Sequence, residues 1–310
     1  MSFFNVVLAR AVTKLRELGI NATTEIVPRN DTEVELKEVE FADDVTGMAV
    51  CDNEVQLQQA LQIMADEYEK YFAAHGLKIN VTKSEHIVLG SPRTMKVMVD
   101  GREEAKSVKL LGLTFDNSYS FAQHADNLTR KMAERNAQLR KISNIADMNT
   151  TRMVAMSNIL SLPNYCSEVF ASNPAIVNRI QMKINDTMRI VTRKGNRARI
   201  KTMMNELKWF TFKETVMYNR LMLLNKILDT AASPHVAILI QKAMMNQQAT
   251  HNTRVRELKI AWRPRLVRKG EQSFIHCAVT LYNHTKIMGK MITKDKIRDE
   301  FKNIIRSWRN

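Results

Sequence analysis

Cysteine is scarce in this sequence, and the scarcity limits the kind of protein it can encode. The 310 residues include three cysteines, Cys51, Cys166 and Cys277, an odd number spread too widely for a metal-binding motif. A disulfide-stabilised framework or a cysteine-rich zinc site is therefore excluded. We expect the chain to work in a reducing compartment, and its length is enough for two or three domains with buried cores.

Long apolar runs and a signal-peptide pattern are also missing. No stretch of the sequence is apolar over the roughly 20 residues that a membrane-spanning helix needs. The N-terminus shows no succession of basic, apolar and small residues typical of a secretory leader. We therefore expect an intracellular protein, cytoplasmic or nuclear, without a membrane partner.

Negative charge is sparse in the second part of the chain. Residues 1–116 carry 13 Lys and Arg against 19 Asp and Glu, a net charge of −6, whereas residues 117–310 carry 34 against 13, a net charge of +21. This imbalance predicts that the second part lies along a polyanion and that the first part holds cations.

Two groups of basic residues are concentrated within the second part. The first group comprises Arg189, Arg193, Lys194, Arg197, Arg199 and Lys201, and the second comprises Arg254, Arg256, Lys259, Arg263, Arg265, Arg268 and Lys269. Such side chains bind phosphates without reading bases, and the binding weakens steeply with salt. A solvated helix face is the structural alternative, but the size of the imbalance favours nucleic-acid binding.

Two adjacent aspartates occupy the predicted tip of a β-hairpin. The flanking segments 34–41 and 45–51 are rich in β-branched and apolar residues, as is typical of strands. Asp43 and Asp44 follow Phe41-Ala42 at the turn. Carboxylates held close together repel each other unless a cation lies between them, and Mg²⁺ prefers such oxygen ligands. Taken alone, the motif is equally compatible with an acidic turn in water.

Further motifs follow this hairpin along the chain. Gly76-Leu77-Lys78-Ile79-Asn80 precedes Lys83-Ser84, the sequence Val-Lys-Leu-Leu-Gly-Leu-Thr-Phe-Asp occupies 108–116, and Phe121 and His124 come next. Together with the aspartate pair, these motifs resemble the reverse transcriptase of non-LTR (LINE-type) retrotransposons, in the order of that family and over roughly 85 residues.

The resemblance implies an RNA-directed DNA polymerase that uses two metal ions, Mg²⁺ or Mn²⁺. Its partners would be an RNA template, a DNA primer and deoxynucleoside triphosphates. Asp43 and Asp44 would be catalytic metal ligands, and Lys83 would lie near the phosphates of the incoming nucleotide; without the family, Lys83 is an ordinary surface lysine. The residues of the primer grip, which presses on the primer end, would be Leu110, Leu111 and Gly112.

The resemblance also implies that part of the polymerase is missing from this chain. A polymerase palm uses three carboxylates, and the first would lie on a strand before Met1, together with the fingers. Two closely spaced cations need that negative charge. We therefore expect the chain alone to be inactive.

The predicted fold class is α+β, with three regions. Residues 1–116 would form a partial palm, an antiparallel sheet with packed helices that includes the primer-grip strands. Residues 117–230 would form a mostly helical thumb, and residues 231–310 a basic C-terminal segment.

Local signals predict individual elements within these regions. Strand-like runs at 85–89 and 95–99 are followed by a two-residue hairpin signal, Asp100-Gly101. After Ser120 glycines are few and methionines many, and we expect helices with most of the 19 methionines in their cores. The residues placed to cap, begin or end helices are Gly19, Asn53, Gly76 and Pro174.

Three functions are open on these observations. The chain can be a truncated, inactive reverse-transcriptase fragment that still binds nucleic acid. It can be half of a working polymerase, completed by another chain that carries the missing strand. It can also be a basic helical binding protein in which the aspartate turn holds no metal.

Overall fold

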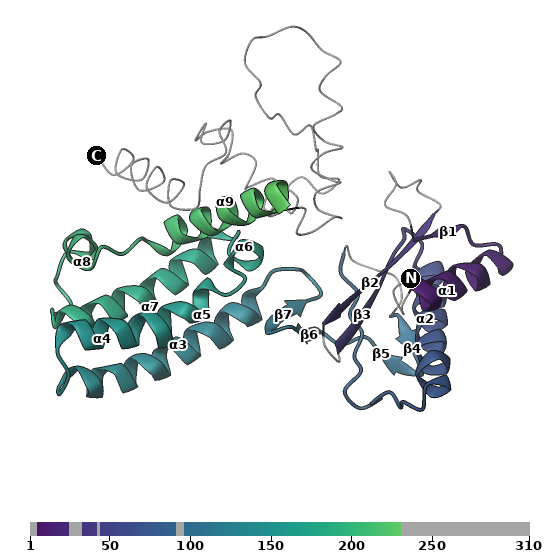
Figure 1. Ribbon diagram of the computed structural model, residues 1–310, viewed down its shortest axis with the longest axis horizontal. Coiled ribbons are helices and arrows are strands. Elements are labelled where there is room, and N and C mark those ends of the chain that lie inside the picture. The colour runs from purple at the N-terminus through teal and green to yellow at the C-terminus, as the bar shows by residue number, and fades with distance from the viewer. Residues whose placement is uncertain (1–4, 25–32, 42–43, 91–95, 231–310) are drawn as a thin grey trace, which may run out of the picture. The chain divides into compact units, whose positions relative to one another are not determined.

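The structure is a computed structural model that describes residues 5–24, 33–41, 44–90 and 96–230. Contacts divide the chain into two compact units, Met1–Ser120 and Phe121–Asn310. The first unit combines helices with small sheets, and the described residues of the second unit are helical (Figure 1). The expected α+β class is confirmed.

The first unit alternates two helices with short strands. Its elements, in chain order, are α1 (Asn5–Glu17), β1 (Ala22–Thr23), β2 (Val34–Phe41), β3 (Asp44–Val50), α2 (Glu54–Ala74), β4 (Met98–Val99), β5 (Arg102–Glu103), β6 (Ser107–Leu110) and β7 (Leu113–Asp116).

The helix boundaries of the first unit follow the local signals. Gly19 and Gly76 adopt positive φ angles of 77° and 71° just beyond α1 and α2. After each glycine, the next N–H reaches the carbonyl five positions back at 2.9 Å, which is the Schellman arrangement. At the start of α2, Asn53 Oδ1 accepts from the backbone N–H groups of Val55 and Gln56 at 2.9 and 3.1 Å. These helix ends were predicted and are confirmed.

The main sheet of the first unit has the strand order β1-β2-β3. Strands β2 and β3 pair antiparallel without interruption from Glu35↔Val50 to Phe41↔Asp44, so residues 42 and 43 join them. The predicted hairpin is therefore confirmed. Side chains alternate along β2: Leu36 is buried, whereas Phe41 on the opposite face is 63% exposed.

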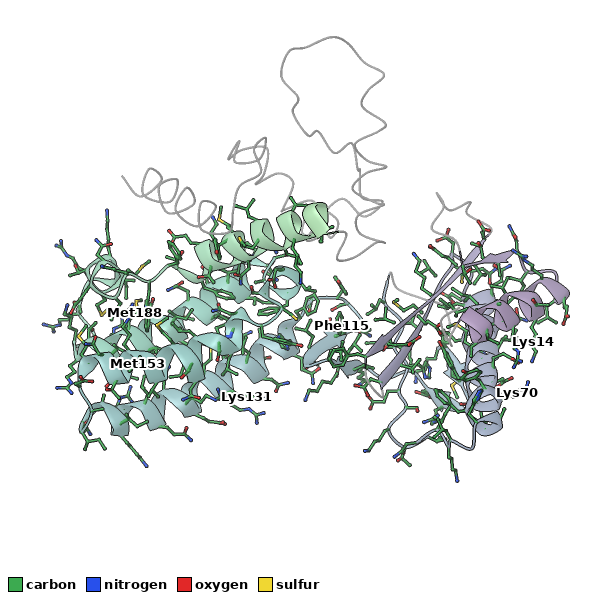
Figure 2. All side chains as sticks on the ribbon, viewed as in Figure 1. Lys14, Lys70, Phe115, Lys131, Met153 and Met188 are labelled. Carbon is green, nitrogen blue, oxygen red and sulfur yellow. The ribbon has the colours of Figure 1, made fainter. Side chains whose placement is uncertain are left out.

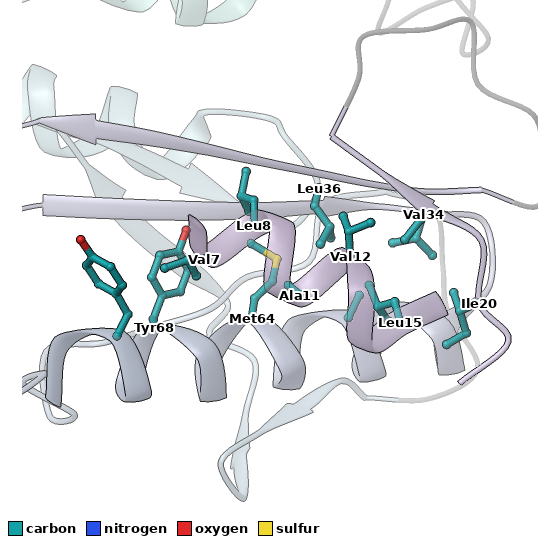
Figure 3. Packing of buried hydrophobic residues seen from close by; sticks show 13 residues of the cluster. Val7, Leu8, Ala11, Val12, Leu15, Ile20, Val34, Leu36, Met64 and Tyr68 are labelled. Carbon is teal, nitrogen blue, oxygen red and sulfur yellow. The ribbon is translucent and has the colours of Figure 1, made fainter. Parts of the chain in front are cut away.

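The core of the first unit lies between the inner face of this hairpin and the helices α1 and α2. Figure 3 shows side chains from all three meeting in one cluster, which includes Val7, Leu8, Ala11, Val12, Leu15, Ile20, Val34, Leu36, Met64 and Tyr68. At Gly47 of β3, an added Cβ would lie 2.7 Å from Met64 Cε and 3.2 Å from Cε2 of Tyr68. The missing side chain at Gly47 therefore allows α2 to approach β3 closely.

The run 85–89 is not a strand, and that prediction was wrong. Val88 instead packs with Val97 and Val99 in a small cluster against α2. Single hydrogen bonds hold the backbone here, such as Ala105 N–H to the His86 carbonyl at 2.8 Å. The apolar run is buried by packing without a strand ladder, a difference that its composition does not reveal. Of the run 95–99, the strand comprises Met98 and Val99.

Two tight turns follow in the first unit. Asp100 and Gly101 connect β4 to β5 with φ angles of 51° and 72°, as predicted for an Asp-Gly hairpin. Leu111 and Gly112 connect β6 to β7 with φ angles of 45° and 87°. The strand pair expected at 108–116 is present, while its function as a primer grip stays a prediction.

The second unit is a group of helices over its described residues. Its elements are α3 (Ala122–Ser143), α4 (Met148–Ala155), the π-helical turn η1 (Met156–Leu160), α5 (Ser161–Asn164), α6 (Ser167–Phe170), α7 (Pro174–Thr192), α8 (Ile200–Leu207) and α9 (Phe212–Thr230). Pro174 occupies the first turn of α7, as predicted. Helix α8 was not predicted, because 8 residues are too few for a helical pattern of apolar residues to be recognised.

Helices α3 and α7 run side by side in the same direction. Near their starts Arg179 pairs with Asp126, and at their ends Arg193 donates to the Ser143 carbonyl at 2.8 Å. The C-terminal ends of both helices therefore lie at the same end of the unit.

The described methionines are divided between core and surface, so the prediction that most of the 19 are in the core is not confirmed for them. Met188 of α7 is 1% exposed, but Met153 of α4 is 64% exposed; Figure 2 labels both. The described methionines that are buried are Met64, Met132, Met188, Met203 and Met204, and those that are exposed are Met48, Met148, Met153, Met156 and Met182. Segment α4–η1 turns Thr151, Ala155 and Ile159 inward, which leaves Met153 and Met156 outward.

Candidate functional site

Of the two predicted metal ligands, Asp44 is the one that the structure describes. Asp44 is the first residue of β3, pairs with Phe41 and is exposed. Asp43 lies outside the described residues. In the parts of the chain that the structure describes, no group of three or more His, Cys, Asp or Glu side chains is arranged to hold a metal ion. Because Asp43 is one of the two predicted ligands, the two-metal site stays a prediction.

Lys83, the predicted phosphate contact, lies in the turn after α2. Its N–H donates to the Asn80 carbonyl at 3.0 Å, and its side chain is exposed. Among the described side chains it has no ion-pair partner, so its position is that of a surface lysine.

The predicted primer-grip residues form the strained tip of the β6–β7 hairpin. Leu110 is half-buried, whereas Leu111 and Gly112 are exposed. A positive φ at Leu111 is uncommon for a residue with a side chain, and strained turns of this kind are concentrated at functional sites. The tip exposes the apolar side chain of Leu111.

The structure separates the first basic group into residues with internal partners and residues without them. Arg189 pairs with Asp186 at 3.1 Å, and Lys194 pairs with Glu206. Arg193 donates to two backbone carbonyls after α3, those of Ser143 at 2.8 Å and Ala146 at 2.7 Å. These three side chains stabilise the second unit.

Arg197 and Arg199 differ from their neighbours. Both are exposed in the connection from α7 to α8, and neither has a carboxylate partner among the described residues. Arg199 is the residue that precedes the first turn of α8. The N-terminal end of a helix carries partial positive charge, so a cation there is not stabilised by its own helix.

Sequence reasoning missed basic residues on the outer face of α3. Arg130, Lys131, Arg140 and Lys141 are all exposed there, and Figure 2 labels Lys131 at the surface. The signal was present: the apolar positions of α3 define its inner face, and these residues fall on the opposite side. They form no compact basic group in the sequence, so a search of the sequence for such groups does not find them.

Basic side chains gather at one end of the second unit. Because α3 and α7 are parallel, Arg140 and Lys141 in the last turn of α3 lie at the same end as the chain after α7. We call this region the basic end; it comprises Arg140, Lys141, Arg193, Arg197 and Arg199. The second basic group, with Arg254, Arg256, Arg263 and Arg265, lies outside the described residues.

A partly buried acidic contact lies on the inner face of the aspartate hairpin. Tyr68 Oη donates to Glu38 Oε2 at 2.5 Å. Burial raises the pKa of the Glu38 carboxyl, the Tyr68 hydrogen bond lowers it in part, and the Glu40 charge adds to the rise. A raised pKa in the folded state means that ionised Glu38 costs stability at neutral pH.

Replacing Glu38 by Gln should therefore stabilise the first unit at pH 7, by less than about 1 kcal/mol because the group is only partly buried. The amide oxygen still accepts from Tyr68. A group with a raised pKa contributes its full stabilisation when the pH is below its pKa in the unfolded state. This stabilisation is lost as the pH rises through its pKa in the folded state. The difference in the free energy of unfolding between the Glu38→Gln variant and the parent should thus vanish toward pH 4. Urea unfolding at a series of pH values measures this difference. A Glu38→Gln variant that is less stable than the parent at pH 7 would contradict this account.

Comparison with protein-family models, with curated proteins and with solved structures finds no match to this chain. None of the helices in the described ranges is both long enough and apolar enough to cross a membrane.

Proposed function

We propose that this chain binds nucleic acid through the basic end of its helical unit, as a fragment of a non-LTR retrotransposon reverse transcriptase. The observation that carries the proposal is the charge of that unit. Residues 121–230 include 18 Lys and Arg against 8 Asp and Glu, and Arg197 and Arg199 have no described acidic partner. A surface of this kind attracts phosphates and weakens with salt.

Stabilisation of helix ends explains only part of the basic end. Arg140, Lys141 and Arg193 lie at helix C-termini, where cations offset the partial negative charge of the helix. Arg197 and Arg199 lie before α8, near its partially positive N-terminus. Because the fold gives these two arginines no electrostatic benefit, an external anion is the partner that best accounts for them.

Two features of the first unit support a polymerase origin. The Asp43-Asp44 turn joins strands of a hairpin backed by two helices, and the Leu111-Gly112 turn presents an apolar tip. In the complete enzyme Asp43 and Asp44 would hold Mg²⁺ or Mn²⁺, which would supply charge stabilisation during nucleotide transfer. For this chain by itself, the activity that we propose is binding of an RNA–DNA duplex.

The proposal is tested by removing the two unpartnered arginines. Arg197→Gln/Arg199→Gln should weaken binding of a fluorescein-labelled RNA–DNA duplex at every salt concentration. The slope of log K against log salt should become less steep by about 2, roughly one unit for each phosphate that the variant no longer neutralises. Fluorescence anisotropy at salt concentrations from about 50 to about 300 mM measures both the affinity and the slope.

The matched control removes the same charge from the first unit. Lys78→Gln/Lys106→Gln changes two exposed lysines there, and we expect it to leave the salt slope unchanged. Circular dichroism checks that each variant is folded. Equal effects of the two double variants would mean that net charge alone, and not the basic end, determines affinity. Parent-chain affinity that is insensitive to salt would refute a phosphate-binding surface.

A further inference from the structure

Within the described parts of the chain, strand β3 is an edge of the main sheet. In the order β1-β2-β3 it has β2 on one side and no strand on the other among the described residues. It is 7 residues long, and its pairing with β2 is continuous, without a bulge. Natural edge strands are usually protected by lysine, proline, a bulge or short length. The sequence Asp-Val-Thr-Gly-Met-Ala-Val of β3 contains none of these residues.

The register of the hairpin identifies the backbone groups on this free edge. A two-residue loop makes Phe41 and Asp44 a hydrogen-bonded pair, so alternate residues of β3 from Asp44 onward bond to β2. The N–H and C=O groups of Val45, Gly47 and Ala49 therefore point away from β2. No backbone hydrogen bond between described residues uses them, and Gly47 is exposed.

The outer face of the hairpin mixes exposed apolar side chains with Glu35, Lys37, Asp44 and Thr46, and Lys37 pairs with Glu35 at 2.6 Å. Met48 and Val50 of β3 are 38% and 43% exposed, and Val39 and Phe41 of β2 are 52% and 63% exposed. The pairing places all four side chains on the face opposite the helices. An open ladder beside a partly apolar face is a surface to which another strand can add.

We propose that β3 pairs antiparallel with β3 of a second copy of this chain, about a two-fold axis at Gly47. In this register Val45 of one copy faces Ala49 of the other, and each Gly47 faces its equivalent. All the free N–H and C=O groups of the edge are then paired.

The charge of β3 favours a second copy of this strand as the occupant. Asp44 is its single charged residue and lies at one end. Antiparallel pairing places Asp44 of one copy opposite Val50 of the other, so the two Asp44 carboxylates are about 20 Å apart. That separation exceeds the screening length of about 8 Å at physiological salt. A parallel pair would bring the two carboxylates together and is disfavoured.

Sedimentation equilibrium of the full chain should show a monomer–dimer equilibrium. Met48→Lys places a charge beside the axis and should raise the dissociation constant at least tenfold. The matched control is Val39→Lys, the same change on the same face but one strand further from the edge, which should have much less effect. A chain that is monomeric at all concentrations overturns the proposal. A dimer whose dissociation constant is unchanged by Met48→Lys also overturns the proposal. If Met48→Lys and Val39→Lys weaken the dimer equally, the two copies stack face to face and do not pair through β3.

Disulfide trapping tests the register itself. In a background with Cys51, Cys166 and Cys277 replaced by Ser, we expect a chain with Thr46→Cys to cross-link efficiently to a chain with Met48→Cys, because these positions face each other as a non-hydrogen-bonded pair. Neither variant alone should cross-link as well as the mixture. Stronger self-linking of Thr46→Cys chains would place the axis elsewhere and overturn the proposed register. This test does not depend on nucleic-acid binding, because it reads the hairpin of the first unit alone.

Discussion

Replacing Phe212 by Ala should lower the free energy of unfolding of the helical unit by about 3–5 kcal/mol. Phe212 is the first residue of α9 and is 1% exposed. Its ring stacks on that of Phe170 with 6.5 Å between centroids, and its N–H donates to Gln181 of α7 at 2.6 Å. The side chain thus joins α9 to α6 and α7, and its removal leaves a cavity at their junction.

Peptide-resolved hydrogen exchange measures this effect for each unit separately. Amides of α6, α7 and α9 should lose protection in the Phe212→Ala variant, and those of α1 and α2 should not. Met182→Ala is the matched control, because Met182 lies on α7 but is 58% exposed and should cost little. Loss of protection in both units would contradict the division of the chain into two compact bodies.

Much of the fold could be predicted because its signals are local. The glycines that end α1 and α2, the asparagine that begins α2 and the Asp-Gly turn between β4 and β5 each act within a few residues. Their effects are decided by backbone geometry and by single hydrogen bonds. The hairpin at 34–50 was equally visible, since two β-rich runs flank a short polar turn.

The fold predictions that were not confirmed concern features that depend on distant partners. Val88 is buried by Leu57 and Leu61 of α2, and no sequence pattern near residue 88 distinguishes that packing from strand pairing. Met153 and Met188 are the same residue type on helices, but one faces solvent and the other the core. Which apolar side chains of a helix are buried is decided by the neighbours that cover them.

The excess of basic residues at the candidate interface could be predicted from the sequence. The contacts that each of these residues makes could not. The sequence locates six basic residues between 189 and 201, but Arg189, Arg193 and Lys194 find internal acceptors on α7, after α3 and on α8. Which arginines remain for a ligand is decided by the packing of those helices. The outer face of α3 contributes basic residues that are dispersed in the sequence and gathered by the fold.

A buried glutamate in the first unit gives the second large effect. Glu67 of α2 is 3% exposed and accepts from Lys14 of α1 and, at 3.3 Å, from Lys70 (Figure 2 labels both lysines). Burial alone would raise the pKa of Glu67, but the two lysines outweigh it and the pKa is lowered. A lowered pKa means that Glu67 stabilises the fold above its unfolded pKa. In the parent chain this stability is lost as pH falls through the folded pKa.

Lys14→Met/Lys70→Met should reverse this pH dependence. Without the lysines, burial governs Glu67, its pKa rises, and the ionised carboxylate destabilises the first unit at pH 7. We expect a loss of about 3 kcal/mol, the low end for an unpaired buried charge, because an open groove of about 720 Å³ beside Glu67 admits water. Protonation should restore the stability as pH falls through the raised pKa. Hydrogen exchange of α1 and α2 at pH 5 and pH 7, corrected for intrinsic rates, measures the change.

The triple variant Lys14→Met/Glu67→Leu/Lys70→Met separates charge from packing. With the carboxylate also removed, no buried charge is left, and apolar replacement of an ion cluster is often neutral or stabilising. The triple variant should therefore regain the stability that the double variant loses at pH 7, and it should lack the pH dependence of both. If double and triple variants are equally unstable, the lysine side chains act through their packing in the groove. The recovery of the triple variant at pH 7 thus decides whether the contact between α1 and α2 depends on the neutralisation of Glu67.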